Sequence, residues 1–169
     1  SQRVHGAKLM HQLKNPHAAE TLLTSYNSLQ GKVSAEDWPD FLWNESDQFE
    51  ARLSQVTIAR SNSVLLDEMD GWQIPVAVAH GEGRASFKEG ALNKLHANQQ
   101  IAVQFSDSKG EIASAYPTNP NGSPEGITGL TSVDGRATIM MPHPERAADK
   151  NLNNLDGLRI FESILAHCS

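Results

Sequence analysis

Cysteine, basic charge and long apolar runs are scarce in this 169-residue sequence, and each shortage excludes a class of protein. Its one cysteine, Cys168, cannot form an internal disulfide, which agrees with a reducing compartment. Lys and Arg number 14 against 20 Asp and Glu, without a basic cluster, so we expect no nucleic acid partner. No apolar run approaches the roughly 18 residues of a spanning helix, and no signal pattern precedes the first segments. The sequence therefore predicts a soluble, cytoplasmic protein that does not enter a membrane.

The length permits one domain with a substantial core and is too short for two ordinary domains. We therefore expect a single domain over residues 1–169. Apolar runs of strand length or alternating pattern predict its strands. They lie at residues 52–58, 74–79, 101–105, 127–131 and 137–141.

Helices and turns are predicted between these strands. Residues 90–98 predict a short helix, and the apolar spacing from Leu155 to Leu165 predicts an amphipathic helix laid on the sheet. Residues 85–87 are expected to return beside 74–79 as a hairpin, and residues 111–115 to pair with 101–105. The aromatic stretch 38–43 predicts an ordered loop.

Two further segments read most simply as turns. His80-Gly81-Glu82-Gly83-Arg84 has glycines that permit a tight turn with solvated charges. The segment 116–126 contains three prolines and two glycines, which exclude a helix or a central strand. Within it, Tyr116 and Asn121 are as well explained by contact with a partner domain as by the turn itself.

The stretch around which the chain is organised is Pro142-His143-Pro144-Glu145, directly after the last predicted strand. An imidazole and a carboxylate two residues apart lie on the same side of an extended segment, so Glu145 can accept the ring N–H of His143. This pair supplies a base and the group that orients it. A loop histidine satisfied by its neighbour is the simpler explanation when the pair is considered alone.

A nucleophile is harder to find. Cys168 lies beside His167, and adjacent helical residues do not face each other, so this thiol has no base next to it. His5, His11 and His17 are six residues apart, which does not align metal ligands on one helical face. We therefore predict no metal site and no cofactor.

Four segments in order carry a family resemblance. They are Asn44-Glu45-Ser46-Asp47-Gln48-Phe49-Glu50-Ala51-Arg52, Pro75-Val76-Ala77-Val78-Ala79-His80-Gly81-Glu82-Gly83-Arg84, Tyr116-Pro117-Thr118-Asn119-Pro120-Asn121-Gly122-Ser123-Pro124 and Ile139-Met140-Met141-Pro142-His143-Pro144-Glu145-Arg146. With these segments the chain resembles the glutaminase domain of phosphoribosylformylglycinamidine synthase, a class I (triad) glutamine amidotransferase that belongs to an ATP-dependent ligase of purine biosynthesis. Residues 38–169 carry the resemblance, and residues 1–37 form a divergent segment.

The resemblance implies a fold and a reaction. It implies an α/β, flavodoxin-like class I glutamine amidotransferase fold that is incomplete at its N-terminal side. It also implies a Cys-His-Glu triad that hydrolyses glutamine through a thioester and passes ammonia to a synthetase domain or subunit. His143 matches the catalytic histidine and Glu145 its carboxylate partner. Val78, Ala79 and His80 match the segment that lines the glutamine site.

The family's nucleophile is not matched. The family carries its cysteine in a Gly-x-Cys-x-Gly turn upstream of the Trp-Pro loop, and this chain has no such turn. One register puts His17 at the cysteine position and another puts His5 there; the first needs the smaller gap before Trp38. The sequence therefore predicts a chain without glutaminase activity when isolated.

Three functions remain open at this stage. The chain is a glutaminase domain that needs a partner chain carrying the cysteine, or a non-catalytic binding or regulatory module that contacts a synthetase or another partner. The third is a hydrolase that recruits Ser25, Ser28 or a water through His143. Loss of the early strands would expose a sheet edge and an apolar face, so we expect a complex or a homo-oligomer.

Overall fold

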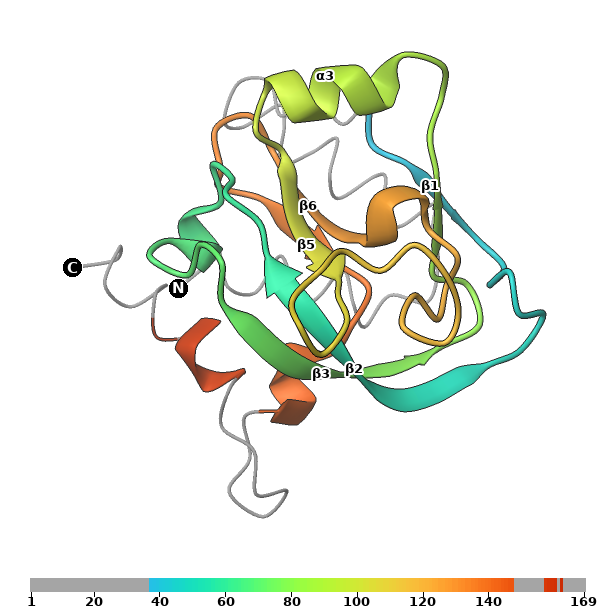
Figure 1. Ribbon diagram of the computed structural model, residues 1–169. Helices are drawn as coiled ribbons and strands as arrows, with labels where there is room; N and C mark the ends of the chain where they lie inside the picture. Colours follow the sequence, from blue (N-terminus) through green and yellow to red (C-terminus); the bar gives the residue numbers. More distant parts are fainter. Residues whose placement is uncertain (1–36, 148–156, 161, 163–169) are drawn as a thin grey trace.

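The computed structural model describes residues 37–147, 157–160 and 162, and Figure 1 shows their arrangement. Strands dominate this part of the chain. They are β1 (Asp40–Leu42), β2 (Glu50–Ile58), β3 (Gln73–His80), β4 (Arg84–Ser86), β5 (Ile101–Phe105), β6 (Ile127–Thr131) and β7 (Thr138–Met140). The helical elements are α3 (Ala91–Ala97) and the 3-10 turns η1 (Val64–Leu66), η2 (Pro124–Gly126) and η3 (Pro144–Ala147). None of these described helices is long and apolar enough to cross a membrane.

Five strands form one sheet in the order β3-β2-β5-β6-β7. The long β2 and β3 lie side by side in Figure 1 and pair from Glu50 with His80 to Thr57 with Gln73. All pairings between the described strands are antiparallel. This part of the chain is therefore an antiparallel sheet with few helices, and the flavodoxin-like parallel sheet stays a prediction that these strands do not show.

The five strands predicted from apolar runs are all present, but one predicted hairpin is wrong and the other is short. Strand β4 pairs with β1 in a separate two-stranded sheet, which also turns part of the predicted loop 38–43 into a strand. Strand β4 cannot return to β3, because β2 occupies one edge of β3 and the backbone of His143 bridges Ala77 on the other. The second predicted hairpin forms only at the end of β5, because β2 and β6 pair with the strand itself. The backbone N–H of Ala113 donates to the carbonyl oxygen of Phe105 at 2.9 Å, that of Asp107 donates to Glu111 at 2.9 Å, and Ile112 bridges Ser106.

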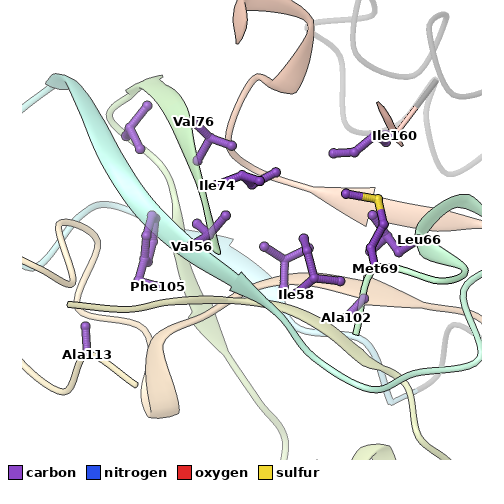
Figure 2. Close-up of a cluster of buried hydrophobic side chains, with 12 residues drawn as sticks. Val56, Ile58, Leu66, Met69, Ile74, Val76, Ala102, Phe105, Ala113 and Ile160 are labelled. Atoms are coloured by element: carbon purple, nitrogen blue, oxygen red, sulfur yellow. The ribbon is translucent and has the colours of Figure 1, made fainter. Parts of the chain in front are cut away.

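The main core lies on the inner face of β2, β3 and β5. Alternation turns every second residue of β2 and β3 inward, and all of these residues except Arg52 are buried. Figure 2 shows the side chains converging, with Ile160 reaching them from the helical turn at residues 158–160. The rest of the predicted C-terminal helix lies outside the described residues. The cluster comprises Val56, Ile58, Leu66, Met69, Ile74, Val76, Val78, Ala102, Val103, Phe105, Ala113 and Ile160.

The outer face of β2 carries exposed apolar side chains at its start. Leu53 is 68% exposed, and Phe49, the residue before the strand, is 64% exposed. Both have the parity opposite to the buried residues of β2, so they point away from the core. The uncovered apolar face predicted from a loss of early strands stays a prediction, because the segment before β1 lies outside the described residues. The outer edge of β3 is partly covered by His143.

Candidate active site

His143 is held against the edge of the sheet. Strand β7 ends at Met140, and the Pro-His-Pro segment leads into η3, which lies beside β3 in Figure 1. The backbone N–H of His143 donates to the carbonyl oxygen of Ala77 at 2.8 Å. The imidazole is buried, and its Nδ1 lies 2.9 Å from Oε1 of Glu145. Backbone and side chain of His143 are thus both fixed.

The contact between His143 and Glu145 has the chemistry of a base and its orienter. A carboxylate accepts hydrogen bonds, so Nδ1 carries the proton and Nε2 is the nitrogen that takes a proton from a reacting group. The sequence predicted this contact from an extended segment. The structure forms it through the 3-10 turn that begins at Pro144, so the predicted contact is present but its geometric reason was wrong.

A second imidazole lies next to this pair. His80 ends β3, is 9% exposed, and its ring centre lies 6.5 Å from that of His143. Its Nε2 lies 2.9 Å from the side-chain nitrogen of Asn121. The buried Glu50 pairs with His80 across β2 and β3, and its carboxylate is held 2.6 Å from Arg52. Two histidines and two carboxylates therefore gather at this end of β3.

Asn44 joins the segments around His80. Its Nδ2 donates to the carbonyl oxygen of His80 at 2.9 Å, and its Oδ1 accepts from the backbone of Gly83 at 3.0 Å and from Asn121 at 2.7 Å. Asn44 and Asn121 are both almost completely buried. Buried amides with this many partners fix the relative positions of the chain segments that carry them.

The family model that matches this chain is that of the CobB/CobQ-like glutamine amidotransferase domain, and it covers residues 19–163. The chain belongs to this family. A chain in the structure of PurLQS from Thermotoga maritima has the same fold, with a TM-score of 0.62 at 23% sequence identity. The alignment covers 78% of this chain and 53% of that one, so the present chain spans about half the length of that protein.

In this member of the family, the sequence-predicted site residues separate into three groups. His143, Glu145 and His80 are brought together. The side chain of Val78 belongs to the core, and that of Ala79 is half-buried on the opposite face of β3. The predicted nucleophile position His17, the alternative His5, the hydroxyls of Ser25 and Ser28, and Cys168 lie outside the described residues.

Sequence reasoning missed two buried residues beside His80, Asn44 and Asn121. The explanation that Asn121 faces a partner domain is wrong, because its side chain is fully buried and faces His80. The turn from Pro120 to Gly122 brings it inward. Tyr116, by contrast, is exposed. An asparagine directly after an aromatic loop and another in a proline-rich turn are available signals, but neither specifies its partner.

The burial of His80 predicts a pH dependence of stability. Burial lowers the pKa of His80 below its ordinary value of 6.5, and the nearby His143 also lowers it. The unfolded chain therefore binds a proton that the native chain does not, so the free energy of unfolding falls as the pH falls below about 6.5. Urea unfolding at a series of pH values measures this slope.

The variant His80→Gln tests the assignment of that slope. We expect its stability to depend less on pH below about 6.5 than that of the wild type, whatever its absolute stability. The variant His96→Gln is the matched control: this ring is exposed on α3, and its contact is the exposed carboxylate of Glu125 at 2.8 Å, to which glutamine can also donate. We expect it to change the slope less than His80→Gln does. Equal slopes in His80→Gln and wild type would assign the effect to other groups.

Proposed function

We propose that this chain supplies the histidine and glutamate of a glutaminase site that releases ammonia for a phosphoribosylformylglycinamidine synthase. The observation that carries the proposal is the 2.9 Å contact between His143 and Glu145, on a loop anchored to β3, in a member of the glutamine amidotransferase family. The likeness to PurLQS in fold and the four sequence segments support the choice of enzyme. The synthetase is then its partner, and the cytoplasm its place of action.

The proposed reaction follows triad chemistry. Nε2 of His143 takes the proton of a cysteine thiol, and the thiolate attacks the side-chain amide carbon of glutamine. The C–N bond then breaks, the same proton goes to the leaving nitrogen, and ammonia leaves behind a thioester that water hydrolyses. Glu145 holds the imidazole and stabilises its protonated form. Val78, Ala79 and His80 are proposed to line the glutamine site, mainly through backbone in the case of Val78.

The nucleophile is proposed to come from outside this chain. No residue near His143 in the described segments is a thiol, and we propose that His17 stands where the family carries its cysteine. Residues 1–169 are proposed to act as one domain, with 38–169 as the family-like part. A partner that brings the cysteine would complete the site.

A glutaminase assay tests this proposal. We expect the purified chain to release no ammonia from glutamine, alone or with a synthetase that lacks the cysteine elbow, which is the Gly-x-Cys-x-Gly turn of the family, because no thiolate faces the amide. Adding a glutaminase fragment that contains the elbow is expected to produce ammonia release. The change His143→Ala should reduce that release by about 10²- to 10⁴-fold, the usual contribution of a general base.

Two controls accompany the assay. The exposed histidine variant His96→Ala is expected to keep full activity in the reconstituted mixture. Ammonia release by the chain alone that a cysteine alkylator abolishes would show that the chain carries its own nucleophile. Reconstituted activity that survives His143→Ala would remove His143 from the mechanism.

The exposed apolar side chains on the outer face of β2 favour a second candidate, a non-catalytic module that binds a synthetase or another partner. Large apolar side chains such as Leu53 and Phe49 are rarely left exposed together unless another surface covers them. Light scattering with the synthetase distinguishes the two: a complex that forms but stays inactive when the elbow fragment is added supports the binding module.

A further inference from the structure

The hydrogen bonds around Asn44 leave only one possible orientation for its side chain. The backbone nitrogen of Gly83 can only donate, and it lies 3.0 Å from one end of the Asn44 amide, which must therefore be Oδ1. The other end lies 2.9 Å from the carbonyl oxygens of Gln48 and His80, which can only accept, so it must be the NH₂ group. Three backbone partners with fixed donor or acceptor character therefore agree on this orientation.

The orientation of Asn44 then fixes that of Asn121. Oδ1 of Asn44 can only accept, so the atom of Asn121 that lies 2.7 Å away must be its NH₂ group. That same NH₂ group lies 2.9 Å from Nε2 of His80. A donor so close to a ring nitrogen requires a lone pair there. The proton of a neutral His80 must therefore be on Nδ1.

The surroundings of His80 agree with a neutral ring. A protonated His80 would direct an N–H at the NH₂ group of Asn121, in a site that is almost closed to water. Two titratable groups shift the pKa of the ring: His143, just before η3, lowers it, and Glu50, from β2, raises it. Of these, Glu50 has its own cation in Arg52 at 2.6 Å. Burial also lowers the pKa of His80.

The other ring nitrogen of His80, Nδ1, is not engaged by the two asparagines. It is buried and has no hydrogen-bond partner of good geometry. The backbone of Met141, just before Pro142-His143, lies near the ring and acts to raise its pKa. A second positive charge with its ring centre 6.5 Å from that of His143 would oppose the imidazolium that the proposed reaction forms on His143.

We propose that Asn44 and Asn121 are positioning residues that hold His80 as a neutral imidazole protonated on Nδ1, beside the His143–Glu145 pair. The pair of asparagines keeps the second histidine of the site uncharged while the first takes up and releases a proton. This role rests on the proposed glutaminase function, whereas the protonation state of His80 does not.

The experiment is a two-bond ¹H–¹⁵N correlation spectrum of the full-length chain at pH 7.5, which distinguishes the three protonation states of each histidine ring. His80 of the wild type is expected to show a protonated Nδ1 and an unprotonated Nε2. A proton on Nε2, or on both nitrogens, in the wild type would overturn the proposal without any variant.

The variant Asn121→Asp tests the cause. It preserves the shape of the side chain but replaces the donor facing Nε2 with a carboxylate, so we expect Nε2 of His80 to become protonated. The matched control Asn93→Asp makes the same chemical change at an exposed position of α3 and is expected to leave the His80 signals unchanged. An unchanged His80 in folded Asn121→Asp would contradict the role of Asn121.

The outcome is separable from that of the glutaminase assay. If His80 has the expected tautomer but no elbow fragment produces ammonia release, the proposed function is wrong and the proposed tautomer of His80 is confirmed. If ammonia is released but His80 is protonated on Nε2, the proposed tautomer is wrong and the proposed function is unaffected.

The variant Asn121→Asp also has a kinetic prediction in an active reconstituted mixture. We expect it to lower kcat more than it changes KM, because it alters the charge beside the base rather than the shape of the glutamine site.

Discussion

The change Phe105→Ala is expected to lower the free energy of unfolding by about 3–5 kcal/mol, the usual cost of truncating a fully buried phenylalanine. Phe105 is completely buried at the end of β5, between β2 and β6, and belongs to the main core cluster. Its removal leaves a cavity that a central strand cannot collapse to fill. Urea unfolding followed by circular dichroism measures the effect.

The change Leu53→Ala is the control for Phe105→Ala. Leu53 is also a large apolar residue on a strand of the same sheet, but it is 68% exposed. We expect its truncation to change the free energy of unfolding by no more than about 0.5 kcal/mol. Similar losses in the two variants would mean that the core does not lie on the inner face of β2, β3 and β5.

The change Gly83→Ala is expected to cost about 1–3 kcal/mol, in the range of overpacked interiors. An added Cβ would overlap Nε2 of His80 and lie 2.5 Å from the side-chain nitrogen of Asn121. Both groups are buried and hydrogen-bonded, so neither can move without breaking the network. We expect lower stability in urea unfolding together with altered His80 ring signals.

Gly81→Ala provides a comparison within the same turn. A Cβ at Gly81 would lie 2.9 Å from the outer ring atoms of Trp43, which is about half exposed and can move into solvent. We therefore expect a smaller loss of stability and unchanged His80 signals. If Gly81→Ala proved the more damaging of the two, the tight packing would lie against Trp43 rather than in the asparagine network.

Most strands of this fold were predictable from the sequence, but their pairing was not. The run from Arg52 to Ile58 alternates, and the run from Ile74 to Ala79 is apolar, so each shows its strand character locally. Whether β4 returns to β3 depends on what occupies the edge of β3. That place is taken by His143, which follows β3 in the chain by more than sixty residues.

The candidate site was also predictable only in part. His143 and Glu145 are two residues apart, so a short turn can bring them together, and their residue types reveal the chemistry. Asn44 and Asn121 are 77 residues apart, and no local pattern indicates that their side chains meet. The sequence offered no separate reason for Asn44, and for Asn121 it offered a turn or contact with a partner domain.

The sequence by itself determined most strand positions, the histidine and glutamate pair and the resemblance to a glutamine amidotransferase, because alternation, short spacing and ordered motifs are properties of the chain. Only the tertiary structure decided the antiparallel order of the sheet and the burial of His80 between Asn121 and the His143 loop. These depend on contacts between distant segments, and such contacts form only when the whole sheet is assembled.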